Sequence, residues 1–411
     1  MEKSIEKSKV FFTDMHTEIG ESLLEKLKRL VKAAGIEQID FKNKFTAVKI
    51  HFGEVGNMAY LRPNYAAAVV EVIKELGGKP FLTDCNTLYV GGRKNALDHL
   101  DTAYRNGYSP FSTGCHVIIA DGLKGTDEAL VPVEGGEFVK EAKIGRAIMD
   151  ADIIITMSHF KGHESTGFGG ALKNIGMGCG SRAGKMEMHN AGKPFVRSRL
   201  CIGCGKCAAV CAHDAPHITN KKASIDQAKC VGCGRCVGVC PTDAVTTAFD
   251  EANDVLNKKI AEYSWAVLHG RPHFHVSFVI DVSPYCDCHS ENDIPIVPDV
   301  GMFASFDPVA LDMACVDAVN RQPAMAGSLL EKQMKAETCR CGNHGALGDH
   351  GTRRDCEEQE AESGCGHDPA PRKGMEQDHF TMVTPETDWR SAISHSIRMG
   401  LGSGEYELIE I

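Results

Sequence analysis

Several features common in other protein classes are missing from this chain of 411 residues. No apolar run approaches the roughly 20 residues that a membrane-spanning helix needs. The opening stretch MEKSIEKSKV is charged and lacks the apolar centre of a signal peptide. Basic residues are not in excess, because 45 Lys and Arg face 55 Asp and Glu and leave a formal net charge of −10. We therefore expect a cytoplasmic protein with no membrane and no nucleic-acid partner.

Nucleotide-binding signatures are missing as well. No G-x-G-x-x-G opens a helix after the first expected strand, and no G-x4-G-K-[ST] loop occurs. A nicotinamide cofactor is therefore not supported, whereas a flavin stays open. The composition is otherwise that of an ordinary globular protein, with 43% hydrophobic and 24% charged residues. The length predicts two or three domains.

Cysteine, by contrast, is abundant, with 18 residues in the chain. Two runs, CIGCGKCAAVC and CVGCGRCVGVCP, each have the spacing C-x2-C-x2-C-x3-C. This double pattern is typical of the ligands of two 4Fe–4S clusters, in which the fourth cysteine of each run crosses to the other cluster. Zinc is the alternative, but zinc sites use separated pairs rather than four cysteines within about eleven residues, twice over. The expected ligand sets are Cys201, Cys204, Cys207 and Cys240 for one cluster, and Cys230, Cys233, Cys236 and Cys211 for the other.

The two runs resemble bacterial two-cluster ferredoxins over residues 195–249. One departure is that Ala212 follows the first run, where the pattern expects a proline such as Pro241 after the second run. The number of ligands is unaffected by this difference. Cysteines at this spacing, in a chain with no visible export signal, favour reduced thiols over disulfides.

The segments on either side of the two runs alternate between expected strands and helices. This alternation predicts an α/β fold with a mostly parallel sheet and helices on both faces, interrupted by a small α+β ferredoxin-like domain. We expect an α/β domain over 1–194 and 250–411, with the cluster domain over 195–249 inserted between its two parts. Strands are expected at 46–52, 80–84, 116–121, 152–158 and 273–282, and helices at 17–34, 63–76, 94–105, 141–151, 251–263 and 308–319.

Residues 337–377 differ from the rest of the second part, because they are rich in Gly and charged residues and poor in branched aliphatics. The simpler interpretation is a mobile surface excursion. A third metal site is the alternative, although the cysteine spacing there matches no standard zinc pattern. The cysteines concerned are Cys339, Cys341, Cys356 and Cys365.

Reactive side chains cluster where expected strands end, which is where open α/β sheets usually bind ligands. Lys49 and His51 alternate along one expected strand and would share a face, unless they belong to a solvated surface. The stretch from Ser158 to Gly178 is dense in glycine and basic residues, and we interpret it as a loop around an anion such as a phosphate or carboxylate. A metal is the weaker alternative, because lysines would repel it. The candidate catalytic residues are His159, Lys161, His163, Lys173, Lys49 and His51.

Further cysteines occur outside the two runs. Cys286 and Cys288 follow an expected strand and could ligate a metal or a further cofactor, or could simply be small buried residues. Asp84 ends another expected strand and could join the same site. The remaining four are expected to be packing residues, since free cysteine is usually buried; they are Cys85, Cys115, Cys179 and Cys315.

Several motifs in the flanking segments identify a resemblance. The stretches KIHFGEVGN, TDCNTLYVGGR, HFKGHESTGFGGALKNIGMG, SPYCDCH and DVGMFASFDPVALD are similar to those of uncharacterised iron–sulfur centre proteins. In that family a domain of unknown function 362 carries an inserted two-cluster ferredoxin-like module. The resemblance implies cluster binding and a redox role, and it brings no established reaction. The cysteine-rich stretch at 337–377 departs from the family pattern.

Three functions follow as hypotheses. The first is electron transfer, as in an iron–sulfur oxidoreductase, from two 4Fe–4S clusters to a substrate or cofactor in the α/β domain, with a redox protein or small molecule as partner. The second is a non-catalytic binding or sensor protein whose clusters are structural or respond to oxygen or iron. The third is a non-redox enzyme acting on a small anionic ligand. The oligomeric state, the substrate and the cluster potentials do not follow from the sequence.

Overall fold

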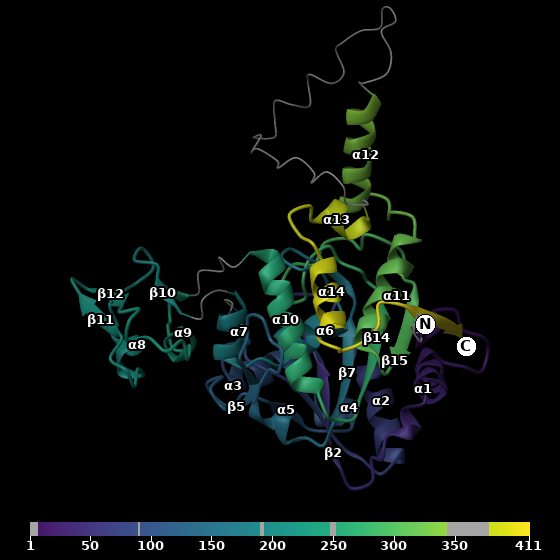
Figure 1. Cartoon of the computed structure of the whole chain (residues 1–411), viewed down its shortest axis with the longest axis horizontal. Helices are drawn as coiled ribbons and strands as arrows, with labels where there is room; N and C mark the ends of the chain where they lie inside the picture. The colour runs from purple at the N-terminus through teal and green to yellow at the C-terminus, as the bar shows by residue number, and fades with distance from the viewer. Residues whose placement is uncertain (1–6, 89–90, 190–192, 247–251, 343–377) are drawn as a thin grey trace, which may run out of the picture.

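A single eight-stranded sheet forms the centre of the computed structural model, which describes residues 7–88, 91–189, 193–246, 252–342 and 378–411 (Figure 1). All neighbouring strands from β14 to β4 run parallel, β1 and β16 are also parallel, and β15 is antiparallel to both of its neighbours. The mostly parallel α/β sheet expected from the sequence is confirmed. In spatial order the strands are β16 (Tyr406–Glu410), β1 (Ser8–Asp14), β15 (Gly301–Ser305), β14 (His273–Val279), β7 (Ile153–His159), β2 (Phe45–Ile50), β3 (Lys79–Asp84) and β4 (Val117–Ile119).

The sequence of β7 explains its central position. Its residues IIITMSH are all buried, as in parallel strands that are covered on both faces and read as continuous apolar runs. Ile155 pairs with Val48 of β2 on one side and Phe274 of β14 on the other. Successive residues then point to opposite faces, so Ile154 and Ile155 belong to two different apolar clusters.

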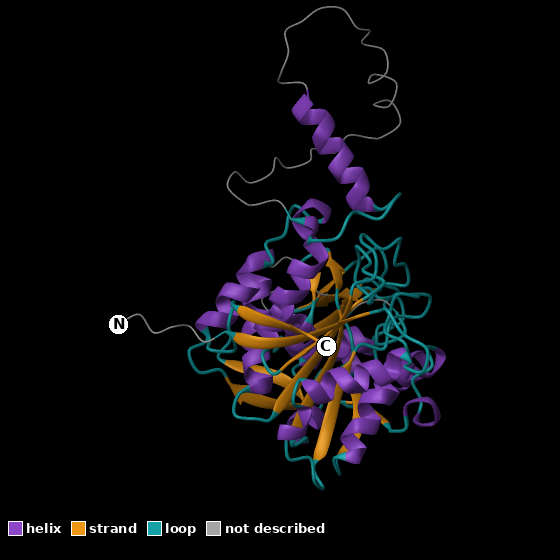
Figure 2. Cartoon of the chain, turned by 90° about the vertical axis from the view of Figure 1, so that its right-hand side faces the viewer, coloured by secondary structure: helices purple, strands orange, loops and turns teal. Residues whose placement is uncertain are grey.

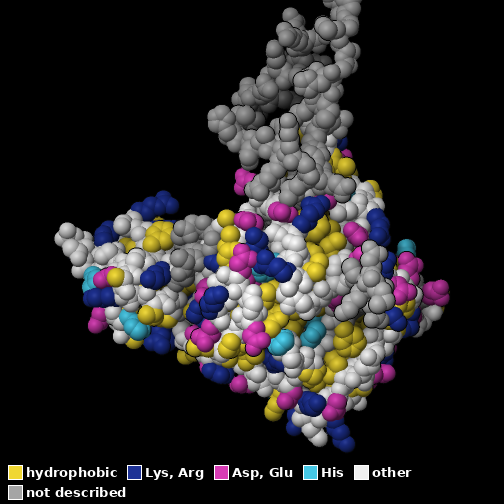
Figure 3. All heavy atoms as spheres, viewed as in Figure 1, with side chains coloured by type: hydrophobic (Ala, Val, Ile, Leu, Met, Phe, Trp, Pro, Cys, Tyr) yellow, Lys and Arg dark blue, Asp and Glu magenta, His cyan; other side chains and the backbone are white. Residues whose placement is uncertain are grey.

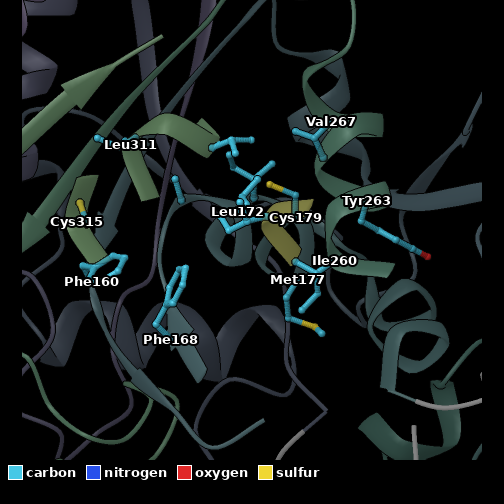
Figure 4. Packing of buried hydrophobic residues seen from close by; sticks show 14 of the residues in the cluster. Phe160, Phe168, Leu172, Met177, Cys179, Ile260, Tyr263, Val267, Leu311 and Cys315 are labelled. Carbon is cyan, nitrogen blue, oxygen red and sulfur yellow. The ribbon is translucent and has the colours of Figure 1, made fainter. Parts of the chain in front are cut away.

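Helices cover both faces of this sheet (Figures 1 and 2). One face packs against α1 (Leu23–Ala33) and α2 (Pro63–Glu75). The other face packs against α6 (Ala171–Cys179), α10 (Asn253–Leu268) and α11 (Pro308–Asn320). Figure 4 shows the second cluster, in which α6 and α10 bury their apolar side chains against each other.

The remaining elements of the α/β part are short, and two of them correct the sequence-based expectation. Residues 141–151 do not form one helix, because Glu141–Gly145 is strand β6 and only Arg146–Asp150 is helical (α5). Ala142 and Ile144 are both buried, which is the period of a strand, and β6 pairs with β5 (Glu128–Pro132). The others are η1 (Ile36–Gln38), α3 (Ala96–Arg105), α4 (Pro110–Thr113), β8 (Lys161–His163), β9 (Gly167–Gly169), α7 (Arg182–His189), α12 (Leu329–Gly342), α13 (His379–Val383) and α14 (Arg390–Arg398).

Residues 193–246 leave the main sheet and form small structures of their own, drawn beside the main body in Figure 1. The main sheet takes strands from before and after this segment, which we call the cysteine module. Its four strands form two antiparallel pairs. The elements are β10 (Phe195–Val196), α8 (Lys206–Ala209), β11 (Pro216–Thr219), β12 (Lys222–Ile225), α9 (Arg235–Gly238) and β13 (Val245–Thr246).

The cysteine module has its own apolar core, and this core reaches the α/β part. Leu88 and Met186 of the α/β part pack in one cluster with Cys207 and Cys236 of the module. An ion pair also joins Lys94, just before α3, to Asp243. These contacts attach one wall of the α/β part to the cysteines of the module.

The expectations for residues 337–377 fall largely on positions that the structure does not describe. The backbone of α12 continues to Gly342, so the stretch begins as a helix. The side chains of Cys339 and Cys341, and the whole of 343–377, lie outside the described residues. Within the described ranges, none of the helices combines the length and apolar character required to cross a membrane.

Candidate functional site

A cavity of about 60 Å³ lies at the carboxyl ends of β2 and β3, beside β8 and α6. A single water molecule needs roughly 10–15 Å³ on this measure, so the cavity has room for several water-sized groups. Its position is that expected for a ligand site in an open parallel sheet. Four of the six candidate catalytic residues line it, namely Lys49, His51, Lys161 and Lys173. Cys286 and Cys288 line it as well, and so does Asp84.

The glycine-rich stretch before and within α6 is not the loop that the sequence suggested. Residues 161–169 form the β8–β9 hairpin, and Lys173 lies in α6. Its glycines permit close packing, because a Cβ at Gly170 would lie 2.3 Å from Oδ1 of Asp312. Asp312 accepts hydrogen bonds from the backbone N–H groups of Ala171 (2.6 Å) and Leu172 (3.0 Å). The start of α6 is therefore occupied by a carboxylate of the protein, which removes these donors from any anion site.

Most of the cations around the cavity are also neutralised by the protein. Nζ of Lys49 lies 3.0 Å from Asp84 and donates to Oδ1 of Asn174 at 2.7 Å. Although burial opposes it, Lys49 holds the pKa of Asp84 well below its ordinary value. The basic sequence motif thus builds a network of buried ion pairs more than an open cationic pocket.

Two more ion pairs follow the same pattern. The guanidinium of Arg93 lies 3.0 Å from Glu54, and Nζ of Lys161 lies 3.2 Å from Asp287. Lys185 differs, because its hydrogen bonds go to the carbonyl oxygens of Gly178 and Gly180 at 3.3 and 2.6 Å. It is the cavity lysine best placed to attract a small anion.

Cys286 and Cys288 lie side by side with Lys173. Nζ of Lys173 donates to Sγ of Cys286 at 3.3 Å. The pKa of Cys286 lies well below its ordinary value, because Cys288 donates a hydrogen bond to its sulfur and Lys173 stabilises the thiolate against the effect of burial. The same hydrogen bond, together with burial, raises the pKa of Cys288 well above its ordinary value. The two sulfurs therefore differ in acidity, with Cys286 the more acidic of the pair.

The two cysteines belong to groups of side chains that could hold a metal ion. Donor atoms of His163, Cys286 and Cys288 all lie within 4.8 Å of one another, and so do those of Glu164, Cys288 and His289. Both groups mix nitrogen or oxygen with sulfur, as zinc and other transition metals accept. The cysteine-rich chain therefore offers ligand sets suited to a metal site.

His159 and His163 have positions different from those of the other candidates. Nδ1 of His159 faces Asp287 at 2.8 Å and Nε2 faces the carbonyl oxygen of Ile280 at 2.8 Å. This ring holds Asp287, which lies between the two cysteines, and it is not among the side chains that line the cavity. His163 accepts two backbone N–H groups at Nδ1 and lies with the cysteine pair.

His51 lines the cavity and is held from two sides. Gly53 donates its backbone N–H to Nδ1 at 3.0 Å, and Nη1 of Arg93 lies 2.8 Å from Nε2. Burial and the nearby guanidinium of Arg93 lower the pKa of His51 well below its ordinary value. The ring is therefore neutral near pH 7 and cannot serve as a cation for a ligand.

The eight cysteines of the module line two separate cavities. Each cavity takes three cysteines from one run and the fourth from the other run. Backbone N–H groups point at some of these sulfurs, for example Ala223 at Sγ of Cys201 (3.2 Å) and Ala215 at Sγ of Cys211 (3.5 Å). The first cavity is lined by Cys201, Cys204, Cys207 and Cys240, and the second by Cys211, Cys230, Cys233 and Cys236.

Sequence reasoning missed several residues of the α/β site. Lys185 lines the cavity from a segment that no motif marked, and Arg93 ends the quoted motif TDCNTLYVGGR but was not named as a site residue. Asn174 and Asp287 were inside quoted motifs, but their roles as partners of Lys49 and Lys161 depend on tertiary contacts. The four cysteines expected to be packing residues are all buried, and one of them, Cys85, also lines the cavity.

Comparison with known proteins gives distant similarities. A thylakoid-associated protein of Synechocystis sp. is 27% identical over 130 residues, which is 30% of this chain and 34% of that protein. The chain thus spans about a third of the length of this curated relative. A crystal structure of a Thermotoga maritima protein covers 72% of this chain and 58% of its own chain at 16% identity and a TM-score of 0.38. The lactate racemase apoprotein of Thermoanaerobacterium thermosaccharolyticum covers 67% and 51% at 10% identity and a TM-score of 0.33.

A family model gives the broader match. The family described as "Domain of unknown function (DUF362)" matches residues 46–317, which is more than half of the chain and includes both the cavity and the cysteine module. The chain therefore belongs to the DUF362 family.

Proposed function

We propose that this chain is an iron–sulfur protein that carries two 4Fe–4S clusters in an inserted ferredoxin-like module and passes electrons to a ligand in the cavity of the α/β domain. The observation that carries this proposal is the exchange of cysteines between the two runs. Each cavity of the module combines three cysteines of one run with the last cysteine of the other. That exchange is the ligand pattern of two-cluster ferredoxins, whereas two independent zinc sites would each use one run.

The surroundings of the sulfurs suit clusters as well. Cys201 accepts hydrogen bonds from the backbone N–H groups of Gly203 (3.4 Å) and Ala223 (3.2 Å). Hydrogen bonds to ligand sulfurs stabilise their negative charge and are among the features that set cluster potentials. When bound, each cluster supplies reversible one-electron transfer. The residues that would hold the clusters are the eight cysteines of the two cavities.

The contact between the cysteine module and the α/β domain supports electron transfer from the module to the cavity. Met186 of α7 packs with Cys236 of the module, while its neighbour Lys185 lines the α/β cavity. Leu88 and Thr87 form a second such pair, since Leu88 packs with the module and Thr87 lines the cavity. The module and the cavity therefore share one thin wall of the protein.

The opposite side of the module is suited to a redox partner. Cys204 is exposed, and Ile202 beside it is 63% exposed, so the first cavity lies close to the surface. We propose that a donor protein or small molecule exchanges electrons here. On the face of the molecule that Figure 3 shows, basic and acidic side chains are intermingled and no large patch has one sign of charge.

The test is anaerobic purification followed by metal analysis and reductive titration. We expect about eight irons and eight sulfides per chain, and an absorption change on titration with dithionite. Exchange of Lys185 and Thr87 for alanine should leave the metal content unchanged. Zinc in place of iron, or no reducible chromophore, would contradict the proposal.

A further inference from the structure

We propose that Cys286 and Cys288 form a redox-active dithiol that reduces small disulfides in the α/β cavity. The proposal rests on the proposed function in one respect only, namely that the clusters of the module return the electrons. The thiol chemistry itself depends on residues of the α/β domain.

Cys286 and Cys288 lie close together in the cavity. The two Sγ atoms lie within 4.8 Å of each other, both cysteines are free, and both line the cavity. A disulfide needs the sulfurs at about 2.05 Å, so the two side chains must move toward each other when it forms. Asp287 between them is fixed by His159 and Lys161, which keeps the short loop in place.

The sulfurs of Cys286 and Cys288 have different neighbours. Lys173 lies 3.3 Å from Cys286 and makes that sulfur the better nucleophile of the two. Cys288, two residues further along the chain, serves as the resolving thiol.

One contact of the pair disfavours a metal ion at Cys286. The ammonium nitrogen of Lys173 lies 3.3 Å from Sγ of Cys286 and would repel a cation bound there.

The reaction balances as an ordinary exchange. The Cys286 thiolate attacks one sulfur of the substrate disulfide, forms a mixed disulfide and releases the other half as a thiolate. Cys288 gives up its proton and displaces the first half, which leaves the Cys286–Cys288 disulfide and, with one proton from solvent, two substrate thiols. Two electrons and one proton then restore the thiolate and the thiol. Two one-electron clusters match this two-electron demand.

The cysteine pair has neighbours that reach both solvent and the cysteine module. Glu164 and His289, whose side chains are 42% and 37% exposed, hydrogen-bond at 2.8 Å close to Cys288. Lys185 and Thr87 line the same cavity and adjoin the residues that contact the module.

The experiment equilibrates the anaerobic full-length chain in mixtures of oxidised and reduced dithiothreitol, stops exchange with acid, and alkylates the denatured protein. In reducing mixtures we expect two alkyl groups on the peptide that carries Cys286 and Cys288. In oxidising mixtures the same peptide should carry no alkyl group and should have two hydrogens fewer than the unalkylated dithiol form. The change should occur in one two-electron transition. Cys315 is the matched control, because it is buried in the same part of the chain and should be alkylated in every mixture. In the Cys288→Ser variant, Cys286 has no partner for a disulfide, so the two-electron change in its alkylation should disappear.

Two outcomes would overturn the dithiol. One is full alkylation of both cysteines in every mixture. The other is a stoichiometric metal that the Cys286→Ser/Cys288→Ser double variant loses. The iron and sulfide content of the same preparation is read separately. Little iron with an intact dithiol transition would contradict the clusters and leave the dithiol standing, whereas about eight irons with no transition would do the reverse.

Discussion

The cysteine module and the α/β cavity both present cysteine sulfur, but they are specified in different ways. The module draws its eight cysteines from two runs with one spacing, so a short local sequence determines which sulfurs meet. The cavity pair Cys286 and Cys288 depends on Lys173 of α6 and on Asp287, which is held by His159 at the end of β7. A regular local motif thus determines which sulfurs of the module meet, whereas the surroundings of Cys286 and Cys288 come from several elements.

The largest effect should come from removing a ligand of the module. Cys207→Ala deletes a buried sulfur of the first cavity. We expect the iron content to fall from about eight to about four per chain, since a 4Fe–4S cluster needs four cysteines. Cys115→Ala is the control, because Cys115 packs in the apolar cluster of the α/β domain and should leave the iron content unchanged. Equal iron in Cys207→Ala and the unaltered chain would remove the basis for the crossed ligand sets.

A change in the cavity network should affect stability and leave the module intact. Asp287→Asn leaves Lys161 without its buried carboxylate partner at 3.2 Å and weakens the contact with His159. Removing one partner of a buried ion pair costs about 3–5 kcal/mol, so the urea midpoint of the α/β domain should fall clearly. Iron content should not change. A variant that loses iron as well would show that the two regions depend on each other.

Replacing Lys173 should change the reactivity of Cys286 in the cavity without affecting the cysteines of the module. Lys173→Met keeps the length of the side chain and removes the charge beside Cys286. We expect alkylation of Cys286 by iodoacetamide to slow and the pH of half-maximal alkylation to rise by about one unit, because the variant loses a positive charge that stabilises the thiolate. Lys185→Met is the control, since the bonds of Lys185 go to carbonyl oxygens. Equal slowing in both variants would mean that the effect is not local to the cysteine pair.

The last effect vanishes at neutral pH and concerns the acid stability of the α/β domain. Burial lowers the pKa of His99 to about 3, whereas an unfolded chain binds a proton near pH 6.5. Between these values the unfolded state binds more protons, so stability is fully present above about pH 6.5 and is lost as the pH falls toward 3. The slope is at most about 1.4 kcal/mol per pH unit for one histidine. His99→Leu should flatten the dependence of the urea midpoint on pH between 6.5 and 4; an unchanged slope would contradict this assignment.

Sequence patterns predicted the parallel sheet well, because its buried strands are continuous apolar runs such as IIITMSH in β7. They failed at Glu141–Gly145, where residues with helical composition pair with β5 instead. The glycine-rich stretch was expected to be a loop but forms the β8–β9 hairpin and the start of α6, and nothing local reveals that Asp312 of α11 caps that start. Lys49 and Lys161 were found as site residues, but their neutralising partners come from other strands and loops.

The central claim is that cysteines exchanged between the two runs hold two iron–sulfur clusters. Anomalous scattering from anaerobic crystals at the iron absorption edge tests it most directly. The account predicts two separate iron sites, one enclosed by Cys201, Cys204, Cys207 and Cys240, and one by Cys211, Cys230, Cys233 and Cys236. Signal at the zinc edge alone, or sulfurs of one run bonded to each other, would contradict it.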